Sequence, residues 1–461
     1  MNLEQLRKQA KELTRAARDG DAAALERLGG REPILSRAQL VLAREHGYPS
    51  WPALVAAVEA DADSFVLAAT GRRRTRAEAL LAARPEIADD PWASLVLGRG
   101  FAGDVNTPGG PRSWAPLLYV CHSCFPSAAL ARELLERGAD PNASFENEYG
   151  SMSALYGAAG IAHDAELTRV LLEAGADPDD GESLYHATEA PSADCLRLLL
   201  EHGAAPRGTN ALAHALDYDA PNHDAHDHAR LLLEAGADPN EGALVAHAVR
   251  RGCGPATIRL LAEFGADLGR PGGETWRGDV PLRTPYQHAV LRARDDVAEA
   301  LAELGASTEV SHEDAAVSAL ARGERSVALL PERLDHDQQE VIVLAALRGH
   351  LDAVVDAAGP NFRGVVGGSP EGSLLHHAAW IGSAELVEAL LARGADPGGA
   401  GGADGTPLAW AAHGSQHHRM EGHDYVAVAE LLVAAGDAVD PSMREIAEGP
   451  LYAWLEERIE S

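Results

Sequence analysis

A short string of residues returns along most of this chain, and it limits the folds that the sequence can adopt. Its clearest copy is Leu-Leu-Leu-Glu-Ala-Gly-Ala-Asp-Pro-Asn at 231–240. Every copy carries a glycine at the same place: Gly138, Gly175, Gly203, Gly236, Gly265, Gly305, Gly394 and Gly436. Successive glycines are 28 to 42 residues apart, except for one gap of 89 residues before Gly394. A period of this length indicates a repeat array, whose units bury their apolar faces only by stacking on one another.

Each copy also has an upstream half, which is clearest as Asp-Gly-Thr-Pro-Leu-Ala-Trp-Ala-Ala-His-Gly at 404–414. Thr406 can cap the start of a helix, and Pro407 fits the first turn of that helix. In the downstream half, the leucines form the buried face of a second helix, and the glycine supplies the left-handed residue that ends it. The Asp-Pro pair then begins the turn to the next unit. Each unit is therefore predicted to be a helix–turn–helix.

The two halves together resemble the ankyrin repeat, whose signature runs Thr-Pro-Leu-His-x-Ala-Ala and, after a second helix, Gly-Ala-Asp-Pro-Asn. The resemblance covers about 114–441, although only two copies keep the Thr-Pro pair and only His376 occupies the motif histidine. It implies an all-α ankyrin-repeat solenoid of about nine to ten helix–turn–helix units with short β-hairpin or loop connections and helical caps. An aromatic content of only 5% agrees with many small, closely packed helices.

The sequence predicts four regions. Residues 1–62 are expected to form an N-terminal helical cap, because helical stretches lie on both sides of Gly47 and the segment looks like the opening of many bacterial ankyrin proteins. The other regions are a helical, repeat-like segment at 63–113, the ankyrin repeats at 114–441, which are degenerate at about 311–363, and a C-terminal capping helix at 442–461. The apolar face of that last helix consists of Leu451, Trp454, Leu455 and Ile459.

The charge of the chain narrows its possible partners. It has 70 acidic and 39 basic residues, which give a formal net charge of −31. Such a field repels phosphate backbones and anionic lipid, so neither nucleic acid nor a membrane is an expected partner, whereas a cationic partner is favoured. Solubility alone is the simpler explanation of the charge. The N-terminus lacks the apolar run of a signal peptide and no span of 18 apolar residues occurs, so a cytoplasmic location is expected.

A column of histidines marks the predicted binding site. By the resemblance, the x of the ankyrin signature and the residue three positions later lie on the exposed concave face of the first helix. These positions, with Trp276 of a long hairpin added, give the candidate groove: Tyr119, His122, His186, Glu189, His214, Asp217, His247, Arg250, Trp276, His288, His377, Trp380, Trp410 and His413. In so acidic a protein the imidazoles are expected to be biased towards protonation. The set suits a ligand with polar or anionic groups and an apolar body.

Several functions are compatible with such a groove. The first is a scaffold that holds a partner protein without chemistry, which is what the resemblance implies. The alternative is an enzyme or small-molecule binder, in which His186 with Glu189, His214 with Asp217, and His247 perform acid–base chemistry. An acidic mimic of nucleic acid comes last, because the acidic residues are spread through every repeat. A purely structural role is open for the histidines as well, since they can bond the backbone of a neighbouring repeat.

Other candidate motifs are weaker. His223, His226 and His228 could hold a metal, and a second cluster of His413, His417, His418 and His423 stands at the equivalent place in the last unit, but such inserts are usually solvated. Cys121 and Cys124 form a CxxC whose positions are packed in the repeat, so core cysteines are the better interpretation. The glycine-rich loops at 269–278 and 398–405 lack the Lys-Ser/Thr of a phosphate-binding loop. No metal and no cofactor are predicted.

Overall fold

The computed structural model describes residues 3–30, 33–217, 225–273, 281–325, 329, 333–367, 369–401, 405–417 and 422–459. The chain divides into two compact units, unit 1 at Met1–Asp238 and unit 2 at Pro239–Ser461. Within the described ranges both units are stacks of short helices, and the strands form two small antiparallel hairpins. The predicted all-α repeat architecture is confirmed. None of the helices in these ranges is both long and apolar enough to cross a membrane.

Unit 1 begins with helices that precede the regular repeats. These are α1 (Leu3–Arg18), α2 (Ala22–Arg27), α3 (Leu35–Glu45), α4 (Trp51–Glu59), α5 (Ala62–Thr70), α6 (Arg74–Ala83), η1 (Pro85–Asp89) and α7 (Pro91–Val96). The first three pack around a small core that includes Ala10, Leu13 and Leu42. Leu54 of α4 joins Leu6 and Ala43 in a second cluster. The role of 1–62 as a cap stays a prediction.

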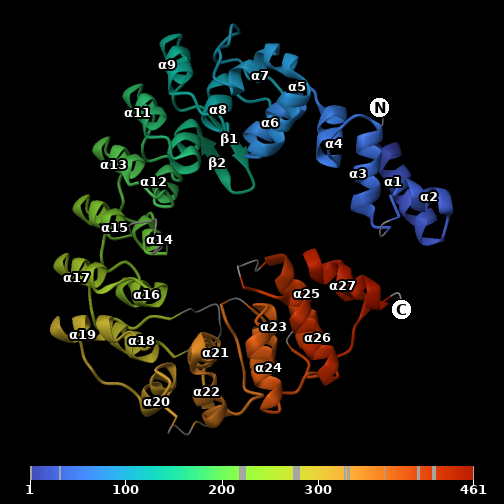
Figure 1. The fold of residues 1–461 in the computed structure, drawn as a ribbon. Coiled ribbons are helices and arrows are strands. Elements are labelled where there is room, and N and C mark those ends of the chain that lie inside the picture. The colour runs from blue at the N-terminus through green and yellow to red at the C-terminus, as the bar shows by residue number, and fades with distance from the viewer. Residues whose placement is uncertain are drawn as a thin grey trace. The chain divides into compact units, whose positions relative to one another are not determined.

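The repeats of unit 1 follow as alternating first and second helices. They are α8 (Pro116–Cys121), α9 (Ala128–Glu136), the hairpin β1 (Ser144–Asn147) and β2 (Gly150–Ser153), α10 (Ala154–Tyr156), the π-helical turn η2 (Gly157–Ala162), α11 (Ala165–Glu173), α12 (Ser183–Ala187), α13 (Asp194–Glu201), α14 (Ala211–Ala215) and α15 (Ala225–Glu234). The first helices α8, α12 and α14 lie in one row, and α9, α11, α13 and α15 lie in a second row (Figure 1). The turn η2 contacts both α8 and α12 and belongs to the first row. We call these the first-helix row and the second-helix row.

The turn motif of each repeat explains how neighbouring units join. Gly175 has a φ of +93° and ends its helix in the left-handed conformation. Asn142 of the preceding repeat reaches this turn, where its Nδ2 donates to the carbonyl of Gly175 at 3.3 Å and its Oδ1 accepts from the amide of Asp177 at 2.8 Å. Asn240 and Asn361 make the same pair of bonds in unit 2. The asparagine of the turn motif therefore links one turn to the next through two hydrogen bonds.

Unit 2 continues the alternation and closes with a helix after the last repeat. Its elements are α16 (Leu244–Arg251), α17 (Pro255–Glu263), α18 (Pro285–Leu291), α19 (Asp295–Glu303), α20 (His312–Ala321), α21 (His336–Ala345), η5 (Ala346–His350), α22 (Leu351–Ala358), β3 (Arg363–Gly364), β4 (Gly372–Ser373), α23 (Leu374–Trp380), α24 (Ala384–Ala392), α25 (Pro407–His417), α26 (Tyr425–Ala435), η7 (Pro441–Ile446) and α27 (Gly449–Ile459). Leu451, Trp454 and Leu455 of α27 are buried in the core of this unit. Its apolar face packs as its sequence pattern indicates.

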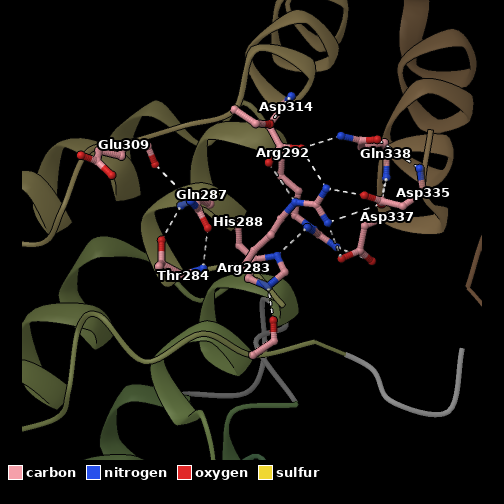
Figure 2. Close-up of polar contacts among 12 residues, drawn as sticks. Arg283, Thr284, Gln287, His288, Arg292, Glu309, Asp314, Asp335, Asp337 and Gln338 are labelled. Atoms are coloured by element: carbon pink, nitrogen blue, oxygen red, sulfur yellow. Dashed lines mark hydrogen bonds and ion pairs between the residues drawn. The ribbon is translucent and has the colours of Figure 1, made fainter. Parts of the chain in front are cut away.

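The degenerate repeats of unit 2 contain buried charges. Arg283 is 4% exposed, and its guanidinium donates to both carboxylate oxygens of Asp314 at 2.9 and 3.0 Å. The same group bonds Asp335, which caps α21, at 2.6 Å (Figure 2). Asp337 is 1% exposed and lies 3.6 Å from Arg283 and 3.7 Å from Arg292. Because a buried charge is costly unless it is paired, this network sets how α18, α20 and α21 meet.

Candidate functional site

Six of the described residues of the predicted groove are buried, and four of them are almost fully enclosed. Tyr119, His122, His288 and His377 have exposed fractions of 4% or less. The hydroxyl of Tyr119 donates to the carbonyl of Gly109 at 2.8 Å and accepts from the amide of Arg112 at 2.8 Å. These side chains face the interior of the stack, so their predicted place on an exposed surface is wrong.

Three of these four enclosed residues are histidines, and each bonds the carbonyl of a hairpin residue. The Nε2 atom of His122 lies 2.9 Å from the carbonyl oxygen of Ser153. The corresponding distances are 2.8 Å from His288 to Gly272 and 3.0 Å from His377 to Gly364. A carbonyl only accepts, so each Nε2 carries the proton. Each ring therefore fastens a hairpin to a first helix, which is the structural role that the sequence left open.

Burial also reverses the expected charge of these rings. It lowers the pKa of His122 to about 4, and it lowers the pKa of His377 as well. Burial, followed by the charge of Arg292, lowers the pKa of His288 to about 3. The predicted bias towards protonation is therefore wrong at these positions, because desolvation outweighs the acidic field of the chain. At neutral pH these imidazoles are uncharged and cannot attract an anionic ligand.

His186 of α12 differs from these buried rings, because it stays partly exposed between two carboxylates. The Nδ1 atom of His186 lies 2.7 Å from Glu189 Oε1, and its Nε2 lies 3.3 Å from Glu182 Oε2. The three side chains are 26%, 31% and 33% exposed, in the order His186, Glu189, Glu182. Their spacing of four and three residues puts them on one side of the helix. The predicted contact between His186 and Glu189 is present.

Aromatic rings surround this group. The ring of Tyr156 lies 5.1 Å from that of His186, and Tyr185 stacks on His214 with centroids 3.7 Å apart. The close approach at Tyr156 needs a glycine, since a Cβ added to Gly160 would stand 2.7 Å from the Tyr156 ring and 2.8 Å from the His186 Cβ. Burial, followed by the charges of Glu182 and Glu189, raises the pKa of Tyr156. We call Tyr156, Glu182, Tyr185, His186, Glu189 and His214 the α12 cluster.

His214 lies at the buried edge of the α12 cluster. It is 8% exposed, and its Nδ1 lies 2.9 Å from the hydroxyl of Thr188 and 3.3 Å from the carbonyl of Tyr185. Its Nε2 is 3.9 Å from Glu189. Burial lowers the pKa of His214, although Glu189 and the exposed Asp217 oppose the shift. His214 therefore positions the tyrosine ring beside it and contributes little exposed surface.

Of the remaining predicted residues, Trp380, Trp410 and His413 lie together beside His377 in unit 2, with ring centroids 5.1 to 6.0 Å apart. His247 and Arg250 are half-buried on α16, Trp380 is half-buried on α23, Trp410 is buried in α25, and His413 is exposed on α25. Trp276 and His223 lie outside the described residues. His228 is buried on α15 and His226 is half-buried beside it. Within the described ranges, no three His, Cys, Asp or Glu side chains converge as metal ligands.

Three residues of the α12 cluster were missed from sequence. Tyr156 and Tyr185 occupy the motif-histidine position, one residue before the x that was considered. Glu182 stands four residues before His186, which is one helical turn. Extending the pattern by one turn in the N-terminal direction would have found Glu182.

Both histidines of the α12 cluster are engaged by neighbouring protein groups. A general base needs one ring nitrogen turned towards its substrate while the other is oriented by a partner. Both nitrogens of His186 face carboxylates, and those of His214 face groups of the protein. His247, the third predicted catalytic histidine, belongs to unit 2. Two part-exposed carboxylates and a part-exposed tyrosine ring are groups that bind a cation.

Comparisons with known proteins agree on the repeat type. Residues 155–243 match a family model of ankyrin repeats in three copies, and residues 373–400 match a single ankyrin repeat. The human ASB11 ankyrin repeat domain is 20% identical with a TM-score of 0.34, over 52% of this chain and 96% of that one. The ankyrin repeat domain of Bcl-3, a member of the IkappaB family, is 23% identical with a TM-score of 0.31, over 39% and 82%. No curated protein matches the chain.

Proposed function

The chain carries ankyrin repeats, a typical protein–protein interaction module, and we propose that unit 1 holds a partner protein on the exposed part of its first-helix row. The observation that carries the proposal is the α12 cluster, in which Glu182 and Glu189 remain about one-third exposed beside Tyr156. Tyrosine is enriched at protein interfaces because it offers a large rigid surface with a polar end.

The charge of the α12 cluster favours a basic segment as the partner. Two carboxylates face one imidazole, so the group carries negative charge even when His186 is protonated. A lysine or arginine of the partner could pair with Glu182 or Glu189 and lie over the ring of Tyr156. The net charge of −31 would speed the approach of such a segment. In unit 2, the exposed His413 and the half-buried His247, Arg250 and Trp380 are further candidates for contact.

Panning a random peptide library displayed on phage against the full chain would test this function. We expect the selected peptides to be enriched in lysine and arginine and to bind more weakly as salt is added. Glu182→Gln/Glu189→Gln keeps the size of both side chains and removes their charge. Calorimetry should show that this variant binds the selected peptides about tenfold more weakly or worse, a difference of about 1.4 kcal/mol.

The matched control removes the same charge elsewhere. Glu173→Gln/Glu201→Gln changes two exposed residues of the second-helix row, on α11 and α13. It should leave affinity unchanged apart from a small effect of net charge. If the selected peptides are no richer in basic residues than the library, or if both double variants bind alike, the α12 cluster is not the contact surface.

A further inference from the structure

The last turn of α25 in unit 2 exposes two histidines that are one helical turn apart. His413 and His417 are four residues apart on α25, so their side chains leave the same side of the helix. Both are exposed, and their ring centroids are 4.8 Å apart with an angle of 40° between the planes. Two imidazoles at this spacing can turn their nitrogens towards one point.

Trp380 of α23 forms a wall behind both rings. Its indole lies 5.1 Å from the ring of His413 and 6.2 Å from that of His417, and it is nearly parallel to the latter, at 9°. Gly414 allows this contact, because an added Cβ there would overlap the Trp380 carbonyl oxygen. The same carbonyl accepts a hydrogen bond from the hydroxyl of Tyr425 at 2.9 Å. These contacts hold the backbone of Trp380 close to α25, so its indole lies beside both imidazoles.

The nitrogens of these two rings are available to a ligand. Within the described residues, His413 and His417 contact other groups only through their rings and form neither hydrogen bonds nor ion pairs. A neutral imidazole nitrogen is the form that binds a metal.

We propose that His413 and His417 chelate a late first-row divalent cation, with water in the remaining coordination positions. Imidazole suits Cu²⁺, Ni²⁺ and Zn²⁺, at nitrogen–metal distances of about 2.0–2.1 Å for zinc. The described residues supply no third histidine, cysteine or carboxylate at this place. Affinity should follow the intrinsic order of the metals, with Cu²⁺ the tightest. The proposal is independent of the α12 cluster, which lies in the other unit.

Trp380 provides the readout for a test on the full chain. Titration with Cu²⁺ should quench tryptophan fluorescence in a saturable way, because the indole lies beside both ligands. Ni²⁺ should compete at higher concentration, and Mg²⁺ should have no effect. His413→Gln and His417→Gln should each raise the Cu²⁺ concentration at half-saturation at least about tenfold, since a chelate needs both rings.

Two further variants make the test specific. His312→Gln removes an exposed histidine on α20 of the same unit and should leave the titration unchanged. Trp380→Phe should abolish most of the quenching while calorimetry still detects Cu²⁺ binding. The proposal is overturned if quenching in His413→Gln and His417→Gln equals that of the wild type. Quenching that never saturates would show adventitious binding only and would also overturn the proposal. Full quenching in Trp380→Phe would overturn it as well.

Discussion

The guanidinium of Arg283 donates two hydrogen bonds, of 2.9 and 3.0 Å, to the carboxylate of Asp314 in the interior of unit 2. Arg283 stands immediately before the repeat that begins with α18, whereas Asp314 lies in the first turn of α20. Because the same guanidinium also bonds Asp335 at the start of α21, one side chain links the N-terminal ends of two helices (Figure 2).

Replacing Arg283 by methionine should destabilise unit 2 strongly. The change leaves Asp314 buried without its cation and leaves Asp337 with Arg292 alone, and an uncompensated buried charge costs about 3–5 kcal/mol. Urea unfolding followed by circular dichroism should show the transition of unit 2 at lower denaturant. Arg132→Gln breaks an ion pair with Glu166 whose side chains are about half exposed, and it should cost less than about 1 kcal/mol. Equal losses in the two variants would mean that the buried network is no stronger than a surface pair.

Acid should weaken the fold through its buried histidines before it reaches the carboxylates. The pKa of His288 is lowered to about 3 in the folded chain, against about 6.5 when unfolded. Between these values only the unfolded chain takes up the proton, so stability is complete above pH 6.5 and falls as the pH drops towards 3. The loss for this residue is about 1.4 kcal/mol per pH unit within that window. Plotting unfolding free energy against pH from 7 to 4 would measure it.

A matched pair of variants isolates the contribution of His288. His288→Gln keeps a donor for the carbonyl of Gly272 but cannot titrate, so its stability should depend on pH with a slope smaller by about one proton. His312→Gln removes an exposed histidine and should keep the wild-type slope. Parallel curves for His288→Gln and the wild type would contradict the assignment of His288 as a buried neutral ring. Asp314 acts only at lower pH: burial would raise its pKa, but Arg283 outweighs burial and lowers it.

The turn between repeats gives a third prediction. Asn142→Ala removes the two hydrogen bonds that link its turn to Gly175 and Asp177. Because the side chain is exposed, the expected loss of unfolding free energy is only about 1 kcal/mol. Asn147 lies at the tip of the β1–β2 hairpin, where its side chain accepts a local hydrogen bond from the amide of Tyr149. Asn147→Ala should therefore change the unfolding free energy by less than about 0.5 kcal/mol. Thermal unfolding of both variants would decide whether the motif asparagine couples neighbouring repeats.

Local chemistry explains why the repeat architecture could be predicted. The residue that ends each second helix is a glycine with positive φ, as at Gly175 and Gly236, and the turn that follows it is fixed by Asp, Pro and Asn. These signals act within a few residues of the chain, so they can be recognised from the sequence alone. The burial of Leu451, Trp454 and Leu455 in α27 could also be predicted, because an amphipathic pattern by itself shows which face of a helix packs against an apolar neighbour.

The candidate site could be predicted only in part, because exposure depends on neighbouring repeats. One residue along a helix turns a side chain by about 100°, so a small error in assigning the x position moves it from the surface to the interior. His288 and His377 face hairpins that their own helices do not specify, whereas His186 stands where Gly160 opens space. The Arg283 network joins residues 31 to 54 positions apart without any period, so no repeat pattern could signal it.

The packing of α25 on α23 gives a last prediction, which concerns Gly414. A methyl group at this position would overlap the carbonyl oxygen of Trp380, so Gly414→Ala must push the two helices apart. Overpacking of this kind costs about 1–3 kcal/mol. Gly254→Ala is the matched control, because a Cβ there meets nothing within 4 Å and the backbone φ is −79°. Thermal unfolding should show a lower midpoint for Gly414→Ala alone. The shift should also move His413 away from Trp380 and so change the fluorescence of that indole, whereas a loss of stability without a spectral change would place the strain elsewhere in unit 2.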